Sequence, residues 1–169
     1  VDGLERAGLA RRRVDPDGIT FQSHIDGATC RFTPESVVAL HETLGADLVM
    51  PLDVCTAHPA DHARALSDIQ LTHEWAARAL AAHRRDDQLL YGIVQGSVYA
   101  DLREASARCV SALGFGAYAV GGVSVGESKL EMLGAIDAAV PHLPAAAPRH
   151  LLGVGQPEDV VEAIARGID

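Results

Sequence analysis

Polar groups and glycines follow four short apolar runs in the sequence, at the points where buried strands would end. Asp53 follows the first run, Gln95 the second, Gly121-Gly122 the third and Gly153 the fourth. A carboxylate accepts hydrogen bonds from neighbouring N–H groups, a carboxamide both donates and accepts, and glycine lets the backbone approach a ligand closely. If the four loops meet at one rim, they suit a planar ligand with several hydrogen-bonding groups, such as a purine-like base.

Each of these groups also has a structural interpretation. Asp53 could cap the loop that follows it, and Gln95 could satisfy the backbone of its own loop. The segment Gly153-Val154-Gly155 lacks the third glycine of a dinucleotide-binding fingerprint, so a Rossmann site is poorly supported. The interpretation as a ligand site therefore depends on the combination rather than on any one residue.

Cys55, His58 and His62 have a spacing that zinc sites use. Pro59 interrupts this segment and no fourth ligand lies nearby in the sequence, so we predict no metal site in these 169 residues. Solvated histidines explain the pattern more simply.

Two further patterns could suggest catalysis. Ser97 stands in Q-G-S-V, which lacks the G-x-S-x-G pattern of an activated serine, and a loop or capping serine explains it. Glu127 and Glu131 are one helical turn apart, as an acid and a base could be, but a solvated helix start accounts for both.

Composition limits the class of protein. The chain has 169 residues, of which 48% are hydrophobic and 22% are charged, which is typical of one globular domain. The formal net charge of −9 argues against non-specific binding of polyanions but leaves room for a nucleic acid bound by a few placed groups. Three widely spaced cysteines and the lack of a long apolar run favour a cytoplasmic protein without a membrane span.

Turn and cap residues predict the elements. Residues 19–24 and 28–32 form a hairpin around a two-residue turn at Asp26-Gly27, and a helix runs from Thr33 to Gly45. Strands and helices then alternate, with strands expected at 48–52, 89–94, 118–120 and 150–152 and helices at 61–83, 100–113, 129–140 and 157–166. Such alternation predicts parallel strands with right-handed crossovers. Both a doubly wound open sheet and part of a (βα)8 barrel fit this pattern, and both place function on the loops after the strands.

Together these segments closely resemble the tRNA-guanine transglycosylase family, the queuine tRNA-ribosyltransferases. The matching stretches cover nearly the whole chain: ITFQSHIDGATCRFTPES (19–36), LGADLVMPLDVCTAHPAD (44–61), YGIVQGSVYADLRE (91–104), GFGAYAVGGVSVGE (114–127) and LLGVGQPEDVVEAIARGID (151–169). The resemblance implies a (βα)8 TIM barrel, of which residues 1–169 would form the central part, with a small β-hairpin near the N-terminus.

The resemblance also implies a reaction. The family exchanges guanine at the wobble position of tRNAs with a GUN anticodon for a 7-deazaguanine, by double displacement through a covalent enzyme–RNA intermediate. Carried over by position, Asp53 would bind the N–H edge of the base, and Gln95 with the Gly121-Gly122 backbone would bind its carbonyl side. Val125, which bacterial members share, implies the small precursor preQ1 as the incoming base rather than queuine.

Further residues carry implied roles. Leu152 stands where a methionine often covers one face of the base. The tRNA-contacting loop would comprise Gly153, Val154, Gly155, Gln156, Pro157, Glu158 and Asp159. Val54 replaces a usual glutamate and Gln156 a common lysine, which removes one charge from the base pocket and one from the tRNA loop.

The family's catalytic aspartates match no position in these 169 residues. The resemblance places the general base upstream, and the nucleophile and a Cys/His zinc site downstream, so no catalytic residue is carried over. We expect the whole protein to be a cytoplasmic pentosyltransferase that binds zinc and forms a homodimer, and this chain alone to be inactive. Two other hypotheses stay open: a non-catalytic subunit that binds tRNA or the base, and an unrelated barrel enzyme with a purine-like ligand.

Overall fold

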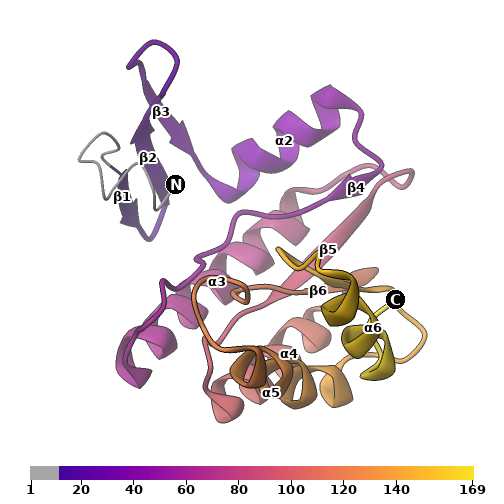
Figure 1. The fold of residues 1–169 in the computed structure, drawn as a ribbon. Coiled ribbons are helices and arrows are strands. Elements are labelled where there is room, and N and C mark those ends of the chain that lie inside the picture. The colour runs from indigo at the N-terminus through magenta and orange to yellow at the C-terminus, as the bar shows by residue number, and fades with distance from the viewer. Residues whose placement is uncertain (1–11) are drawn as a thin grey trace.

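The computed structural model describes residues 12–169 as a mixed α/β fold with two sheets (Figure 1). In chain order its elements are β1 (Arg12–Asp15), β2 (Gly18–Gln22), β3 (Thr29–Phe32), α2 (Pro34–Leu44), β4 (Leu48–Val49), α3 (His62–Ala82), β5 (Leu89–Val94), α4 (Ala100–Leu113), β6 (Ala117–Val120), α5 (Lys129–Ala139), the 3-10 helix η1 (Val140–His142), β7 (Arg149–Leu151) and α6 (Pro157–Ala165). The alternation of strand and helix after residue 45 confirms the predicted order.

The first sheet is antiparallel and has the order β1-β2-β3. The expected hairpin is present as β2 and β3, but the prediction of a two-residue turn between them is wrong. The Ser23 backbone N–H donates to the Ala28 carbonyl at 2.8 Å, so a longer loop joins the strands. The Asp26 carboxylate accepts the Ala28 N–H inside that loop, which explains why Asp26-Gly27 looked like a turn by itself.

Helix α2 begins and ends as its sequence predicts. Thr33 caps its N-terminus by accepting the Ser36 N–H, while the Ser36 side chain bonds back to the Thr33 N–H. Gly45 ends the helix in the left-handed conformation at φ 68°. Helix α2 packs against α3. This contact connects the antiparallel sheet to the rest of the molecule (Figure 1).

The second sheet is parallel, and its order β4-β5-β6-β7 follows the chain. The expected strand at 48–52 is shorter than predicted, because only Leu48 and Val49 pair with β5. Pro51 has no N–H to donate to a ladder, which fits the early end of the pairing.

The two faces of this sheet differ. The larger apolar cluster joins Val94, Tyr118 and Val120 to helix residues such as Val110 and Ile136, so the helices cover that face. A smaller cluster of Tyr91, Ile93, Ala117 and Ala119 lies on the other face, with Met50, Leu89 and Leu152 packed against it. No helix residue from 12–169 belongs to the smaller cluster.

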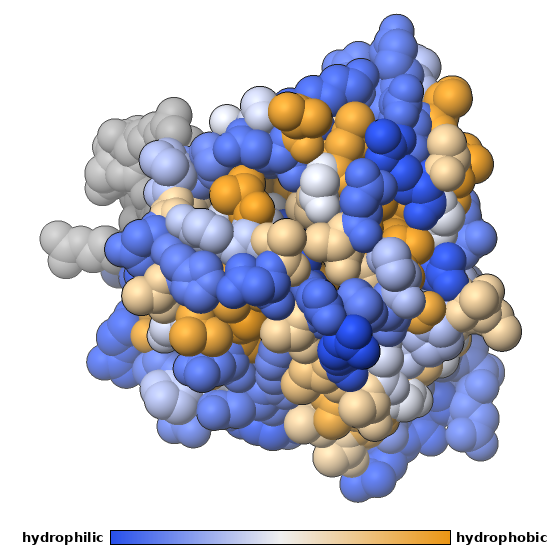
Figure 2. Space-filling model, turned by 90° about the horizontal axis from the view of Figure 1, so that it is seen from below, coloured by the Kyte–Doolittle hydropathy of each residue, from blue (hydrophilic) through white to orange (hydrophobic). Residues whose placement is uncertain are grey.

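The surface seen from below is mostly hydrophilic, and its hydrophobic residues gather in separate patches (Figure 2). This distribution is ordinary for a folded protein, whose surface always keeps some apolar area. Among residues 12–169, no helix is both long enough and apolar enough to cross a lipid bilayer.

Candidate functional site: polar groups at the strand ends

Two predicted site residues from different loops meet directly. The Gln95 side-chain Nε2 donates to Asp53 Oδ2 at 2.6 Å. Asp53 follows β4 and Gln95 follows β5, so the bond forms where neighbouring parallel strands end at the same rim. The structure therefore brings together the carboxylate and the carboxamide that the sequence singled out.

The loop that carries Asp53 is fixed by helix α3. The Val54 backbone N–H donates to Thr72 Oγ1 at 3.0 Å, and the Val54 side chain is buried. Two residues on, the Thr56 hydroxyl donates to Asp68 Oδ2 at 3.0 Å. A valine at 54 therefore fits an apolar position, and helix α3 fixes the loop on the C-terminal side of Asp53.

The loop that carries Gln95 is fixed by helix α4. The Gln95 backbone N–H donates to Ser106 Oγ at 3.2 Å, and this hydroxyl also bonds His73 Nε2 at 3.0 Å. Burial lowers the pKa of His73, so its imidazole is neutral at neutral pH. The buried chain from α3 through α4 fixes the position at which Gln95 leaves the strand.

Gly121 and Gly122 lie against the Gln95 side chain. A Cβ at Gly121 would lie 2.8 Å from Gln95 Nε2, and one at Gly122 would lie 2.1 Å from Gln95 Oε1. Gly122 also has φ +60°, a conformation that side chains rarely adopt. Only glycine fits at these two positions while Gln95 keeps its place.

The site offers hydrogen-bonding capacity that the protein leaves unused. Gln95 is 1% exposed, and its Oε1 is buried with no hydrogen-bond partner among the described residues. A buried acceptor without a partner costs about 1–3 kcal/mol, which a ligand with a matching donor recovers. Burial raises the pKa of the half-buried Asp53, although the hydrogen bond from Gln95 opposes that change.

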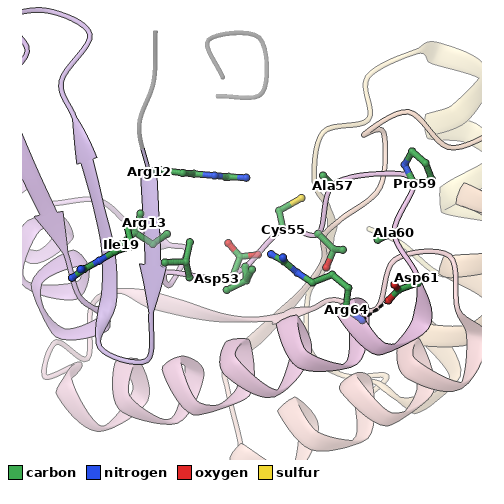
Figure 3. Close-up of a pocket in the computed structure, with 13 residues that line it drawn as sticks. Arg12, Arg13, Ile19, Asp53, Cys55, Ala57, Pro59, Ala60, Asp61 and Arg64 are labelled. Atoms are coloured by element: carbon green, nitrogen blue, oxygen red, sulfur yellow. Dashed lines mark hydrogen bonds between the residues drawn. The ribbon is translucent and has the colours of Figure 1, made fainter. Parts of the chain in front are cut away.

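A cavity of about 750 Å³ opens beside Asp53. It lies between the antiparallel sheet and the loop after β4, and Arg12, Arg13 and Arg64 line it. Figure 3 shows Arg12 of β1 and Arg64 of α3 extending toward the space beside Asp53. In a chain of net charge −9, the two guanidinium groups of Arg12 and Arg64 on this cavity favour a ligand that carries negative charge.

Other predicted residues lie on the loops after β6 and β7. Leu152 packs in the apolar cluster of the sheet's helix-free face, and its N–H donates to the Val120 carbonyl at 3.0 Å. Val125 is half-buried, and its N–H donates to Glu127 Oε2 at 2.9 Å. The Ser124 N–H donates to the other oxygen of Glu127, so Glu127 holds its own turn.

The predicted tRNA loop is exposed except at Val154 and Asp159, which are half-buried. Gly153 has φ +80° and lies close to Val123 of the preceding loop. Gln156 precedes helix α6, whose first turn contains Pro157, Glu158 and Asp159. The Lys129 ammonium pairs with Asp159 at 2.6 Å, so this ion pair links α5 to α6.

The other patterns have structural roles. Among residues 12–169, no group of three or more His, Cys, Asp or Glu side chains could hold a metal ion. His62 bonds Asp101 at 2.8 Å. Glu131 belongs to the capping box with Ser128 at the start of α5. This agrees with the interpretation of Glu131 as part of a solvated helix start.

Reasoning from the sequence missed the arginines of this site. Arg12, Arg13 and Arg64 line the cavity, and nothing in their spacing marked them. Arg103 carried a signal that was available: it stands on the buried stripe of α4 with Leu102, Ser106 and Val110. A charged residue at a core-facing helix position indicates a specific partner.

The family model described as queuine tRNA-ribosyltransferase matches residues 3–169. The chain belongs to the queuine tRNA-ribosyltransferase family. Curated relatives with that name include proteins of Herpetosiphon aurantiacus, 48% identical over 93% of this chain, and Symbiobacterium thermophilum, 49% identical over 94%. The queuine tRNA-ribosyltransferase of Syntrophobacter fumaroxidans is 46% identical over 99% of this chain.

The chain spans 40% of the first two of these queuine tRNA-ribosyltransferases and 45% of the third. The family match extends over all four loops at the rim, since it runs from residue 3 to residue 169. The resemblance that the sequence motifs indicated is therefore confirmed at the level of the family.

Proposed function

We propose that the whole protein is a tRNA-guanine transglycosylase and that these residues recognise the base. The single observation that carries the proposal is the contact of Asp53 with Gln95, packed against Gly121-Gly122 at the strand ends. An ionised Asp53 would accept the N–H groups of guanine, while Gln95 and the backbone of Gly122 would bind its carbonyl side. The family membership supports this assignment.

We further propose that the parallel sheet is part of a (βα)8 barrel. Its four strands follow chain order, as in a barrel, whereas a doubly wound sheet reverses its order at a switch point. Helices cover one face, and the apolar cluster of the other face would then belong to the barrel interior.

In the proposed reaction, guanine at the wobble position of a tRNA with a GUN anticodon is exchanged for preQ1. A carboxylate outside these residues forms a bond to C1′ as the bond from C1′ to guanine breaks, and the incoming base then reverses this step. Val125 would border the incoming base, Leu152 would cover one of its faces, and residues 153–159 would contact the tRNA. The arginine-lined cavity beside Asp53 would accommodate the adjoining sugar-phosphate chain.

The zinc site, the homodimer and the cytoplasmic location that the resemblance implies stay predictions for the whole protein. The described residues contain no group of three or more His, Cys, Asp or Glu side chains that could hold a metal ion. Each of these properties is open to direct measurement on the whole protein by metal analysis, light scattering and cell fractionation.

The test is exchange of labelled guanine into tRNA by the whole protein. We expect label to enter tRNA with a GUN anticodon, preQ1 to displace it, and Asp53→Ala to abolish the exchange. Binding of tRNA without exchange would support the alternative of a non-catalytic partner subunit. Unchanged exchange by Asp53→Ala would disprove the assignment of the base pocket.

A further inference from the structure

Arg103 is a charged side chain in the middle of the core. It lies on the inner face of α4 and is 0% exposed. Burial lowers its pKa to about 10, so the guanidinium is still protonated at neutral pH. Burying a cation costs several kcal/mol unless hydrogen bonds compensate it, so a side chain of this kind calls for a specific explanation.

The compensation comes from main-chain carbonyls of two loops. Arg103 Nε donates to Ser97 O at 2.7 Å, and Nη1 donates to Val94 O at 3.3 Å, both at the end of β5 or just after it. Nη1 also donates to Gly121 O at 2.5 Å, and Nη2 donates to Gly122 O at 2.8 Å, just after β6. One planar guanidinium therefore joins the loop of Gln95 to the loop of the two glycines.

These contacts determine the direction of a donor. In a trans peptide the C=O and the following N–H point to opposite sides. Because Arg103 holds the Gly121 carbonyl, the Gly122 N–H of the same peptide unit points away from Arg103. The backbone of two successive glycines has little conformational restraint of its own. The contact with Arg103 therefore supplies the restraint on the orientation of the Gly121-Gly122 peptide.

The same contacts keep Gln95 in place. Gly122 lies so close to Gln95 that a Cβ there would be 2.1 Å from Oε1. If the glycine loop moved, the side chain of Gln95 would lose the surface against which it lies. The orientation of Gln95 toward Asp53 thus depends on the position of the glycine loop.

We propose that Arg103 is a positioning residue for base recognition, which fixes the Gly121-Gly122 peptide and Gln95 in the geometry that a planar base requires. The inference rests on the proposed function and deepens it. Arg103 is not a catalytic residue, because its donors are used on the backbone and it acts through Gln95 and Gly122.

The test compares Arg103→Lys and Arg103→Gln in the whole protein, with Arg108→Lys as the matched control. Lysine keeps the charge but lacks the planar fork that reaches both loops, and glutamine keeps one amide. Arg108 lies on the same helix, where its exposed side chain pairs with Glu104. Guanine affinity is measured by calorimetry, tRNA affinity by filter binding, and folding by thermal unfolding.

We expect both Arg103 variants to bind guanine at least about tenfold more weakly, the equivalent of one charge-assisted hydrogen bond. The KM for the base rises while kcat at saturating base and tRNA affinity stay within about twofold of the wild type. Arg108→Lys behaves as the wild type. This split between base and tRNA separates positioning from a general loss of structure.

Three results overturn the proposal: unchanged guanine affinity in folded variants, equal losses of base and tRNA affinity, or loss of cooperative unfolding in both variants. The last result would make Arg103 a residue of the fold only. The wild type provides the separate test of the proposed function. A wild type that neither exchanges nor binds guanine overturns both, whereas wild-type binding with unchanged variants overturns only the role of Arg103.

Discussion

Asp53 combines burial with a need for charge. In the proposed base site its carboxylate must be ionised to accept N–H groups, yet burial favours the protonated form and raises its pKa. The hydrogen bond from Gln95 opposes that effect. A residue held in this balance is expected to be unfavourable for stability and useful for binding.

We predict opposite effects of Asp53→Asn on binding and on stability. Guanine affinity falls about 10- to 100-fold, because charge-assisted hydrogen bonds to the base are lost. The free energy of unfolding at neutral pH rises, because asparagine accepts the bond from Gln95 without a buried charge. Calorimetry of guanine binding and urea unfolding measure the two effects.

The pH dependence gives the control for this prediction. With a raised pKa in the folded state, Asp53 favours folding at acid pH, and this contribution is lost as the pH rises through that pKa. The stability advantage of Asp53→Asn therefore shrinks on acidification. An advantage that is the same at acid and neutral pH would contradict the proposed cost of the buried charge.

We predict that Arg12→Gln weakens tRNA binding without affecting guanine binding. Arg12 lines the cavity, and its side chain extends toward the space beside Asp53 (Figure 3). Removal of one phosphate contact reduces the slope of log affinity against log salt by about 1. Filter binding across a salt series measures the slope.

Arg108→Gln is the matched control for Arg12→Gln, because it removes the same charge from the outer surface of α4. Its salt slope should equal that of the wild type. Equal losses of tRNA affinity in both variants would show that the net charge, rather than the cavity, governs binding.

The site was predictable in part from sequence. Asp53, Gln95 and the two glycines stand directly after strands, and the ends of parallel strands must meet at one edge. The side chains that fix them come from helices α3 and α4, and which helical residues face a given loop depends on packing that no local pattern encodes. Arg103 is the exception among these helical side chains, because the sequence alone shows that it lies on the buried stripe of α4.

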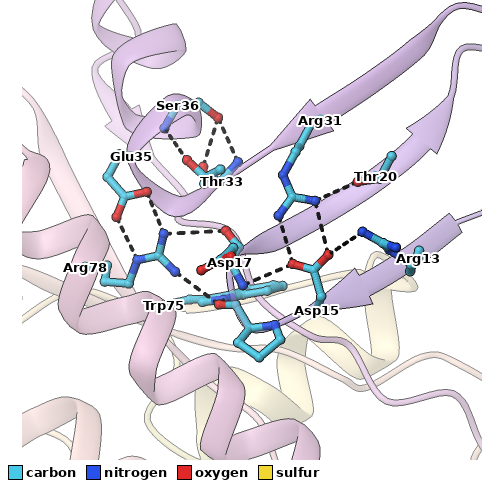
Figure 4. A network of polar contacts seen from close by, with 11 residues as sticks. Arg13, Asp15, Asp17, Thr20, Arg31, Thr33, Glu35, Ser36, Trp75 and Arg78 are labelled. Atoms are coloured by element: carbon cyan, nitrogen blue, oxygen red, sulfur yellow. Dashed lines mark hydrogen bonds and ion pairs between the residues drawn. The ribbon is translucent and has the colours of Figure 1, made fainter.

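At the scale of elements, a polar network docks the antiparallel sheet onto helix α3 (Figure 4). Arg78 contacts both carboxylate oxygens of Glu35 at 2.7 and 2.9 Å and donates to the Pro16 carbonyl at 3.1 Å. Trp75 Nε1 donates to the same carbonyl at 2.8 Å. The turn between β1 and β2 is therefore fixed by two neighbouring side chains of one helix.

We predict that Glu35→Gln weakens this docking at neutral pH by up to about 1 kcal/mol, since the pair is partly exposed. Arg78 lowers the pKa of Glu35 to about 2, so the carboxylate stabilises the fold above its unfolded pKa and this contribution is lost as the pH falls toward about 2. The difference between variant and wild type therefore disappears in acid. Urea unfolding followed by the fluorescence of Trp75, the single tryptophan, measures it.

Glu42→Gln, near the other end of helix α2, is the control and should leave the profile nearly unchanged. The Arg31 side chain lowers the pKa of Asp15 to about 2 as well, so some loss of stability in acid remains in Glu35→Gln. If Glu35→Gln kept the full pH dependence of stability of the wild type, Glu35 would be excluded as a source of that dependence.

Element boundaries show where prediction from sequence succeeds. Caps identified the ends of α2 because Thr33 and Gly45 act on the backbone locally. Strand β1 was missed because its first three residues are exposed, so it shows no alternation of apolar and polar positions. The turn at Asp26-Gly27 was misjudged because the bonds that close it come from Ser23 and Ala28.

At the scale of the whole molecule, the parallel sheet has two edges, β4 and β7. We predict that residues 1–169 expressed alone associate as concentration rises, because unpaired edges and the helix-free apolar face invite contact with other chains. They should also show no guanine exchange. Size-exclusion chromatography with light scattering measures the association, and a single monomeric species that unfolds cooperatively would contradict it.

The chain order of the parallel strands has a consequence for how the protein is made. Each of β5, β6 and β7 pairs with the strand synthesised just before it, and one α-helix lies between each pair, followed by the 3-10 helix η1 in the case of β6 and β7. Among residues 12–169, none of the four parallel strands has to be inserted between two that are already paired. The sheet can therefore grow one unit at a time as the chain leaves the ribosome, so that the rim forms loop by loop in the order of translation.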